Sequence, residues 1–376
     1  MKKTRSKATK LAQTTVSITR PTLEEYSLYA SFFEESIKTG RLTTHKYVRE
    51  FETKAAKYLG VKHCVALSSC SSGLMLVLKG LDLKGEVIIP GFTFAATGHP
   101  LLWNNLTPVF ADVDPKTYTI SPKSVEACIT SKTTAIVVTH VFGVMCDVKK
   151  LEALARKYKL RLIFDAAHAF GSTRAGKRAG NWGDAEVFSL SPIKVLTAAE
   201  GGLLATNNEA LAEFVRIGRN YGDDGSNNML FAGLSARMSE FHAAIALRSL
   251  TKLETNLKNR RLKCTYLKAA LMHIEPRLQF QELPPDAESS NYIFSIVIDS
   301  KTLGYTRDEL YDFLKSRNID SRKYFYPALH TQPPYQKFAP KKGSMEVTDY
   351  LTQSILALPM YSHITQEDMD RVVKSL

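Results

Sequence analysis

Short apolar runs alternate with amphipathic segments through most of the chain from residue 60 to residue 220. The runs are apolar on both faces, as expected of strands that helices cover on two sides. The segments between them repeat apolar residues at helical spacing. We predict strands at 63–67, 86–89, 107–111, 134–139, 161–164, 185–190 and 202–206. We predict helices at 23–38, 46–59, 72–81, 147–158 and 208–216. The predicted fold class is α/β, with a mostly parallel, seven-stranded type of sheet flanked by helices.

The pattern changes after this region. A long helical stretch with a break covers 237–273, and a strand at 291–298 and a helix at 306–316 follow it. These elements indicate a smaller α+β part at the C-terminal end, with a boundary near residue 250. We therefore predict a large domain at 21–250 and a small domain at 251–376. Residues 1–20 read as a disordered basic tail.

Composition narrows the class of protein further. The chain has 376 residues and a net charge of +13, of which the first twenty residues, without any acid, carry six. The mild charge of the remainder suits an anionic small ligand and does not demand nucleic acid. The cysteines are odd in number and scattered, which indicates a reducing compartment and neither a disulfide framework nor a metal site. They are Cys64, Cys70, Cys128, Cys146 and Cys264.

No targeting or membrane segment is expected. The basic start lacks the apolar region of a secretory signal. The uncharged stretch 87–111 is interrupted by Pro90, Gly98 and Pro100, so it cannot cross a bilayer as one helix. We expect a soluble, cytoplasmic protein.

A carboxylate ends one of the predicted strands. In Arg161-Leu-Ile-Phe-Asp165-Ala-Ala-His168, Asp165 follows the apolar run and His168 comes three residues later. Ligands of open α/β sheets bind beyond the carboxyl ends of the strands, so Asp165 and His168 are candidate site residues. An Asp at such a turn also serves as a helix N-cap, and this segment alone leaves both roles open.

A lysine lies between two strands that should both be buried. Lys194 is in the connection Ser189-Leu-Ser-Pro-Ile-Lys194, and Glu200-Gly201-Gly202 follows it. Most lysines are solvated surface charges. A desolvated lysine has a lowered pKa and becomes a nucleophile toward carbonyl compounds.

Two further segments suit a flat, phosphorylated ligand. Ser68-Ser-Cys-Ser-Ser-Gly73 joins a strand to a helix start, where free N–H groups and hydroxyls can bind a phosphate or simply cap the helix. Phe94 follows another strand and can cover a ring, although a core position is the ordinary alternative. A phosphate site, an aromatic cover, a carboxylate and a reactive amine together match the needs of pyridoxal phosphate.

The sequence also resembles a known family. From about residue 21 to the end it is similar to the DegT/DnrJ/EryC1/StrS sugar aminotransferases, which are fold type I pyridoxal phosphate enzymes. The order and joint spacing of several short motifs carry the resemblance. These are Gly40-Arg-Leu-Thr-Thr44, Ser68–Leu74, Pro90-Gly-Phe-Thr-Phe-Ala-Ala-Thr97, Thr107–Asp114, Asp165-Ala-Ala-His168, Phe188–Gly202, Arg237-Met-Ser-Glu-Phe-His-Ala-Ala244 and Tyr326-Pro-Ala-Leu-His330.

The resemblance implies roles for particular residues. Lys194 would hold the cofactor as a Schiff base and act as general base, Asp165 would pair with the pyridine nitrogen, and His168 would lie near the phenolic oxygen. Phe94 would stack on the ring. The phosphate would be held by Ser71, Ser72 and Ser189.

Family members are homodimers with shared active sites, and one cross-interface contact differs here. The family often has Asn two residues before the Arg of the Arg-Met-Ser-Glu motif, where this chain has Ser235. A serine hydroxyl can reach the phosphate directly or through a water. Cys70, where the family usually has Gly, is a second departure.

The implied reaction has two stages. An amino acid, glutamate by family habit, converts the cofactor to pyridoxamine phosphate, and a nucleotide-diphosphate-linked keto sugar then accepts the amine. The motifs resemble the C4-aminating branch more than the C3-aminating branch, which implies a dTDP-4-keto-6-deoxyhexose. Basic residues should line the diphosphate path, and Arg219 is a candidate.

Several alternatives compete with this interpretation. C3 amination stays open. The C3-deoxygenating offshoot carries His in place of the Schiff-base lysine, which Lys194 argues against. A cysteine desulfurase needs a reactive cysteine on a loop, but Cys264 falls in a helical pattern. An enzyme acting on amino acids alone needs an Arg clamp that the sequence does not reveal. A non-catalytic regulator or nucleic-acid binder could use the basic tail, but no helix-turn-helix or stacking aromatic pattern accompanies it.

Overall fold

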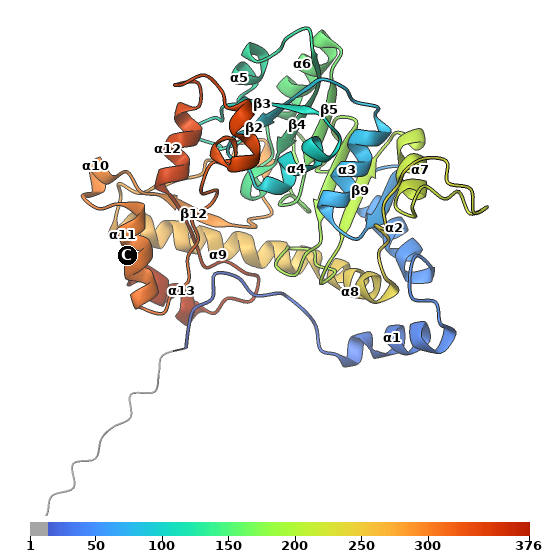
Figure 1. Cartoon of the computed structure of the whole chain (residues 1–376). Coiled ribbons are helices and arrows are strands. Elements are labelled where there is room, and N and C mark those ends of the chain that lie inside the picture. Colours follow the sequence, from blue (N-terminus) through green and yellow to red (C-terminus); the bar gives the residue numbers. More distant parts are fainter. Residues whose placement is uncertain (1–13) are drawn as a thin grey trace, which may run out of the picture.

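A seven-stranded sheet forms the centre of the protein, whose computed structural model describes residues 14–376 (Figure 1). The strand order is β1-β9-β8-β5-β4-β2-β3. The strands are β1 (His63–Leu67), β2 (Glu86–Pro90), β3 (Thr107–Ala111), β4 (Thr133–Thr139), β5 (Arg161–Asp165), β8 (Ala185–Ser189) and β9 (Gly202–Thr206). Strands β3, β2, β4, β5 and β8 pair in parallel, whereas β9 is antiparallel to both β8 and β1. The predicted α/β class with a mostly parallel sheet is confirmed.

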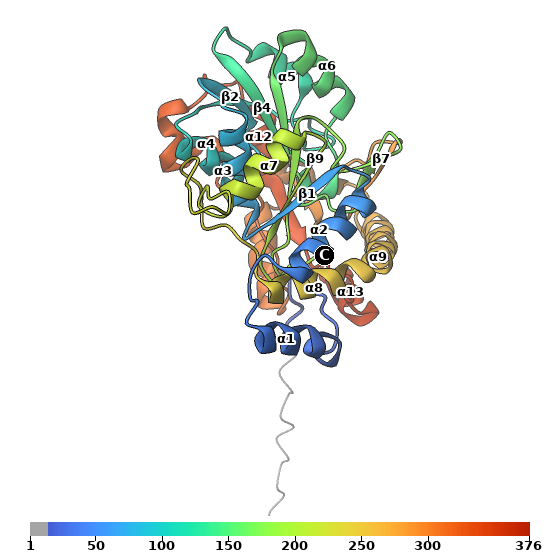
Figure 2. The same ribbon diagram turned by 90° about the vertical axis from the view of Figure 1, so that its right-hand side faces the viewer.

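Helices cover both faces of this sheet. The first six after the N-terminal helix are α2 (Lys46–Leu59), α3 (Cys70–Gly80), α4 (Ala95–Trp103), α5 (Pro122–Ala127), α6 (Val148–Tyr158) and α7 (Glu209–Gly218). Neighbouring strand residues point to opposite layers: Ile88 packs with the core that includes α2 and α6, and Ile89 packs with the core that includes α3 and α7. Figure 2 shows α3 and α7 on one side of β1 and β9, and α2 on the other. Strands apolar on both faces therefore have a core on each side.

Helix α4 was not expected, because its sequence contains Gly98 and Pro100. Tertiary packing explains the glycine. A side-chain carbon added at Gly98 would lie 2.5 Å from the hydroxyl oxygen of Tyr335, so the helix can approach that ring because the position has no side chain. Helix propensity is therefore overridden here by a close contact with a residue far along the chain.

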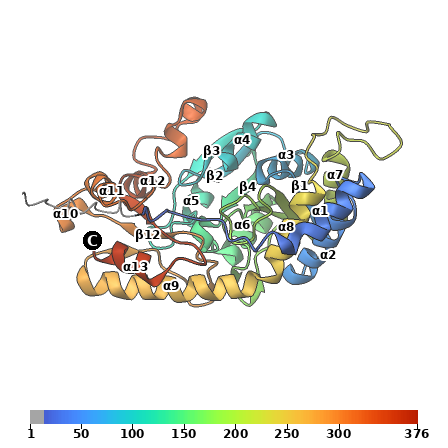
Figure 3. The same ribbon diagram turned by 90° about the horizontal axis from the view of Figure 1, so that it is seen from below.

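The C-terminal part is built on one long helix. The predicted helical stretch divides at Lys252 into α8 (Glu240–Thr251) and α9 (Leu253–Ile274), and Figure 3 shows α9 running along one side of the molecule. The remaining helices are α1 (Ser27–Thr39), α10 (Ser300–Leu303), α11 (Arg307–Ser316), α12 (Glu346–Ser354) and α13 (Gln366–Val373), with short 3-10 turns at Val141–Gly143, Leu329–Thr331 and Pro333–Phe338. The division of the chain into domains at residue 250 stays a prediction.

Two small sheets complete the fold. Strands β10 (Gln279–Phe280), β12 (Phe294–Val297) and β13 (Ile355–Leu358) form one, and β11 (Ala287–Glu288), β6 (Thr173–Arg174) and β7 (Lys177–Arg178) form the other. Strand β12 is shorter than the predicted 291–298. Asn291 adopts a φ of 48°, which is incompatible with a strand, so the ladder begins only after it.

The prediction of a disordered tail over residues 1–20 is wrong for its last part. Val16 is 0% exposed, forms a bridge with Ile319 and packs in the same cluster as Leu267 and Leu314. The cause is one apolar residue, Val16, which forms a β-bridge and packs in the core. The basic composition of the segment gives no indication of this. Residues 1–13 lie outside the described residues.

Over residues 14–376, none of the helices has both the length and the apolar character that crossing a bilayer requires.

Truncating Val16 tests whether this segment is part of the folded core. Val16→Ala should lower the free energy of unfolding by about 2 kcal/mol, because it removes buried methyl groups and leaves a cavity. Urea unfolding followed by circular dichroism measures the change. Leu262→Ala, at a position 60% exposed, is the matched control and should cost much less. Equal losses in the two variants would contradict the assignment of Val16 to the core.

Candidate active site

A cavity of about 320 Å³ opens at the carboxyl ends of the parallel strands. Thr139 ends β4, Asp165 ends β5 and Ser189 ends β8, and all three line it. This is the edge where open α/β sheets bind ligands. Of the residues expected in the site, six line this cavity: Ser71, Phe94, Asp165, His168, Ser189 and Lys194. The arrangement therefore brings together segments up to 123 positions apart, from residue 71 to residue 194.

Asp165 is held at the bottom of the cavity by hydrogen bonds. Its side chain is 3% exposed, accepts from the Thr97 hydroxyl at 2.6 Å and accepts from the Ala167 N–H at 3.1 Å. Burial raises the pKa of this carboxyl, and the two hydrogen bonds and the charge of Lys194 act in the opposite direction. The contacts leave a carboxylate that is fixed in position and largely out of water.

Thr97 belongs to a cluster of hydroxyls that sequence reasoning missed. The Oγ1 atoms of Thr93, Thr97 and Thr139 lie 2.7–3.2 Å apart and are buried. Thr93 and Thr97 are four residues apart at the start of α4, and Thr139 ends β4. The cluster connects two elements and directs one hydroxyl to Asp165. The spacing of Thr93 and Thr97 was visible in the sequence, but their common partner was not.

Lys194 faces the cavity with an amine that no carboxylate pairs with in the described part of the chain. Its Nζ lies 4.2 Å from the centroid of the Tyr292 ring. Burial lowers the pKa of Lys194 to about 8, and the negative charge of Asp165 opposes this shift. A larger fraction of this amine is therefore neutral near pH 7 than for an ordinary lysine, which makes it more nucleophilic.

His168 is packed among aromatic rings. Its ring is stacked at 4.5 Å from that of Tyr292 and lies parallel to Phe325 at 6.2 Å. Its Nδ1 accepts from the N–H of Phe142 at 3.2 Å. Burial, with a smaller contribution from Lys194, lowers the pKa of His168 well below its ordinary value. The imidazole is therefore neutral at physiological pH, and the proton is on Nε2.

The serine-rich turn begins helix α3. Ser69 is the N-cap, and its Oγ accepts from the Ser72 N–H at 3.1 Å. The Ser72 hydroxyl donates to the Ser69 carbonyl at 2.9 Å, so it is directed into the turn, and Ser72 does not line the cavity. Cys70 and Ser71 do line it. Ser69 and Ser72 thus stabilise the helix start, whereas Cys70 and Ser71 face the cavity.

Gly202 allows strand β9 to press against the same turn. A side-chain carbon at Gly202 would lie 2.3 Å from the carbonyl carbon of Ser69, which no neighbouring backbone could accommodate. The backbone of β9 therefore packs closely against the turn and supports it from behind.

Besides Ser72, two other candidate residues lie outside the cavity. Ser235 is exposed, forms a bridge with Asn220 and does not line the cavity within this chain. The neighbouring Ala236 carbonyl accepts from the Ser68 N–H at 2.8 Å, so Ser235 lies close to the serine-rich turn. Arg219 does not suit the diphosphate path: it is 5% exposed, pairs with Glu52 and donates to the Ala66 carbonyl.

The C-terminal part adds residues that the sequence did not suggest. Tyr292, Arg322, Tyr324 and Phe325 line the cavity. The Arg322 guanidinium donates to the Tyr324 hydroxyl at 3.1 Å. These residues are far along the chain from Lys194, and none lies in a motif with a chemical signature. They provide a cation and an aromatic wall opposite the sheet.

This architecture is that of the fold type I pyridoxal phosphate enzymes. The sequence profile of the DegT/DnrJ/EryC1/StrS aminotransferase family matches residues 27–376 of this chain. The chain therefore belongs to that family.

Related proteins extend this result. A GDP-perosamine synthase from Caulobacter vibrioides is 31% identical over 88% of this chain and 89% of its own. A dTDP-4-amino-4,6-dideoxy-D-glucose transaminase from Escherichia coli is 30% identical over 96% of this chain and 98% of its own. The crystal structure of DesI in the presence of its TDP-sugar product superposes with a TM-score of 0.91, at 34% identity over 96% of this chain and 92% of that one. The resemblance inferred from the motifs is confirmed.

The electrostatic link between Asp165 and Lys194 is testable. Asp165→Asn removes the charge that favours the ammonium form, so the pKa of Lys194 should fall from about 8 by about one pH unit. Competitive acetylation of the cofactor-free protein across a pH series, read by peptide mass spectrometry, measures this pKa. Asp147→Asn, at an N-cap outside the cavity, should leave it unchanged. An unchanged or raised pKa in Asp165→Asn would refute the link.

Proposed function

We propose that the protein is a pyridoxal phosphate-dependent aminotransferase that moves an amino group from glutamate to a nucleotide-linked keto sugar. The observation that carries this proposal is the presence of Asp165 and Lys194 in one cavity, as a buried carboxylate and an amine of lowered pKa. Membership of the aminotransferase family supports it. A regulator without catalysis would have no need of a desolvated lysine beside a buried acid.

The residues present fit the cofactor. Lys194 would attach it covalently, and Asp165 would pair with the ring nitrogen. Phe94, which is 61% exposed at the cavity, would cover the ring, and His168 would lie beside it. Ser71 and Ser189, together with the free N–H groups at the start of α3, would bind the phosphate. Ser72 would contribute mainly through the turn it stabilises, because its hydroxyl is engaged there.

The cofactor, when bound, supplies an electron-withdrawing ring and a carbon that carries the amino group. The protein supplies the proton transfers and the charge. Lys194 takes a proton at Nζ from the carbon of the donor amino acid and returns one to the sugar carbon. Because its pKa is lowered to about 8, the amine can both accept and donate a proton near neutral pH. Asp165, fixed by Thr97 and Ala167, keeps the ring nitrogen protonated. His168, held neutral, adds no competing charge.

The substrate is proposed from the relatives and the cavity. A 30% identical transaminase is named for a dTDP-4-amino-4,6-dideoxy-D-glucose, which favours a dTDP-4-keto-6-deoxyhexose aminated at C4. Arg322 is the one arginine that lines the cavity in the described chain, and it suits a carboxylate of glutamate or a phosphate of the nucleotide.

We propose further that two copies form a homodimer with shared active sites. Helix α1 and the loop between α7 and α8 lie at the same end of the molecule in Figures 1 and 3. Both expose several large apolar side chains near one another in the sequence, and such groups on a surface often mark interaction sites. They are Tyr26, Ile37 and Leu42 around α1, and Tyr221, Met229 and Leu230 in the loop. Ser235, which leads out of this loop beside the serine-rich turn, would contact a partner's cofactor site.

A cytoplasmic location belongs to the same proposal. All five cysteines are unpaired, as in proteins of reducing compartments.

Turnover with and without Lys194 tests the proposed activity. Borohydride added to the protein with pyridoxal phosphate should fix the cofactor on Lys194, as read by peptide mass. Glutamate with a panel of nucleotide keto sugars should give an amino sugar, with the aminated carbon read by NMR. Lys194→Ala should lose the adduct and lower turnover at least about 100-fold. Lys132→Ala, on the exposed surface, should retain both. An adduct that persists in Lys194→Ala, or no accepted keto sugar, would contradict the proposal.

The dimer is tested separately. The wild-type protein should sediment at twice the 42.0 kDa of one chain. Ile37→Asp, on α1 at a position 67% exposed, should shift it toward the monomer, because a charge enters an apolar contact. Ile274→Asp, exposed at the far end of α9, should not. Sedimentation velocity distinguishes the species, and a wild-type monomer would overturn this part.

A further inference from the structure

A loop that contacts the aromatic wall of the active site lies outside the cavity itself. It runs from His140, which follows β4, to Cys146, and we name it the 140–146 loop. None of the described residues of this loop lines the cavity that contains Asp165 and Lys194. Its backbone nevertheless contacts two residues that do line the cavity. The loop can therefore act on the site without touching a ligand.

Phe142 makes both of these contacts. Its N–H donates to Nδ1 of His168 at 3.2 Å, and its carbonyl accepts from the N–H of Tyr292 at 3.2 Å. His168 and Tyr292 line the active site, and their rings are stacked at 4.5 Å. Because Nδ1 of His168 accepts this hydrogen bond, the ring proton is held on Nε2, and that nitrogen is a donor.

Phe142 makes these contacts from an unusual backbone conformation. Its φ of 58° lies in the left-handed region, which is strained for a residue with a bulky side chain. Such a conformation persists only where the surrounding structure holds it. One support is next to it, where the Ser172 hydroxyl donates to the Gly143 carbonyl at 2.7 Å.

The side chain of His140 ties the two ends of the loop together. Its Nδ1 accepts from the Cys146 N–H at 3.2 Å, and its Nε2 lies 3.3 Å from the carboxylate of Glu186. The ring stacks on Phe164 at 4.9 Å, and both His140 and Glu186 are 0% exposed. Glu186 accepts the hydrogen bond from Nε2, which leaves Nδ1 free to accept from the far end of the loop.

Two effects compete over the charge of this buried ring. Burial lowers the pKa of His140, whereas Cys146 and Glu186 raise it, to about 9. A second ring proton, on Nδ1, would however point at the Cys146 N–H, which is itself a donor. The hydrogen-bond geometry therefore favours the neutral ring. In either state Nε2 donates to Glu186.

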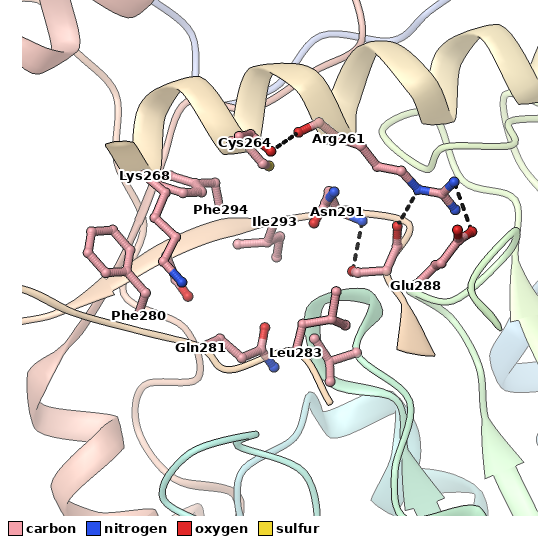
Figure 4. Close-up of a pocket in the computed structure, with 14 residues that line it drawn as sticks. Arg261, Cys264, Lys268, Phe280, Gln281, Leu283, Glu288, Asn291, Ile293 and Phe294 are labelled. Atoms are coloured by element: carbon pink, nitrogen blue, oxygen red, sulfur yellow. Dashed lines mark hydrogen bonds and ion pairs between the residues drawn. The ribbon is translucent and has the colours of Figure 1, made fainter. Parts of the chain in front are cut away.

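Part of the loop borders open space. Val144 lines a second cavity, of about 350 Å³, which lies beside α9 (Figure 4). Figure 4 shows Gln281 and Asn291 among the side chains that line this cavity, and the Gln281 amide donates to the Val141 carbonyl at 3.1 Å. Because a cavity gives no close packing on that side, hydrogen bonds such as those of His140 and Gln281 have to fix the shape of the loop there.

We propose that His140 and Glu186 are positioning residues for the active site. His140 closes the 140–146 loop, and the closed loop holds Phe142 in its left-handed conformation. Phe142 in turn fixes the tautomer of His168. This inference rests on the proposed function, which gives His168 its place beside the cofactor. Neither member of the pair lines the cavity, so both act through the loop alone.

Two substitutions of His140 separate the roles of its two ring nitrogens. The side-chain oxygen of Asn lies near the position of Nδ1, so His140→Asn can still accept from Cys146 but cannot reach Glu186. The side-chain nitrogen of Gln lies near the position of Nε2, so His140→Gln can still donate to Glu186 but leaves the Cys146 N–H without an acceptor. Both variants lose the stacked ring, so each is a matched control for the other.

NMR shifts of the ring nitrogens in histidine-labelled, cofactor-free protein report the tautomer of His168, and His168→Gln identifies its signals. His140→Asn should keep the Nε2-protonated form of the wild type. His140→Gln should give a mixture of both tautomers. It should also bind pyridoxal phosphate about tenfold more weakly, as expected when one hydrogen bond that orders the site is lost.

Stability separates this effect from general destabilisation. His140→Asn leaves the buried Glu186 carboxylate without its donor, so it should have the lower free energy of unfolding of the two variants. The proposal requires the larger change at His168 in the other, more stable variant. Ser172→Ala removes the donor to Gly143 and keeps the His140–Glu186 pair, so it should also mix the tautomers, even if a His140 variant does not fold.

Unchanged His168 signals in His140→Gln or in Ser172→Ala would overturn the proposal, and so would equal changes in the two His140 variants. The NMR readout needs no cofactor. A failure of the proposed reaction, with no adduct on Lys194 in the wild type, is therefore distinct from a failure of this inference.

Discussion

The burial of one carboxylate at the end of a parallel strand is the constraint on which the active site depends. Asp165 is out of water, and an unpaired charge there would be costly. The structure compensates with a hydroxyl from α4, an N–H from the following turn and the nearby cation of Lys194. The hydroxyl cluster, the position of α4 and the connection that carries Lys194 all serve this one group.

The carboxylate and the amine depend on each other. Burial alone moves their pKa values toward the neutral forms, up for Asp165 and down for Lys194. Their mutual attraction acts against both shifts. The amine is left with a pKa of about 8, close to the working range of a group that both accepts and returns a proton. His168 lies next to this pair, and its neutrality keeps a second positive charge away from the amine.

Much of the fold and the sheet-borne part of the site could be predicted from the sequence. Asp165 and Ser189 end apolar runs, and Lys194 lies in a connection between two such runs, so their placement follows from strand geometry. Tyr292 and Arg322 could not be found this way, because they enter the site through tertiary packing of the C-terminal part. Arg219 shows the opposite mistake. The sequence suggested that it binds the diphosphate, but its side chain is buried and pairs with Glu52. No local pattern in the sequence reveals such a pair.

The position of β9 between β1 and the rest of the sheet has a consequence for how the chain folds during its synthesis. β1 lies at the edge of the sheet, and its neighbour there is β9, with His63 opposite Thr206. The amino-terminal strand therefore has no place in the sheet until more than a hundred further residues have left the ribosome. The serine-rich turn follows β1 directly and rests against Gly202 of β9. During translation the phosphate-binding corner thus assembles late, after β2, β4 and β5 have emerged, and a nascent chain halted before β9 would lack it.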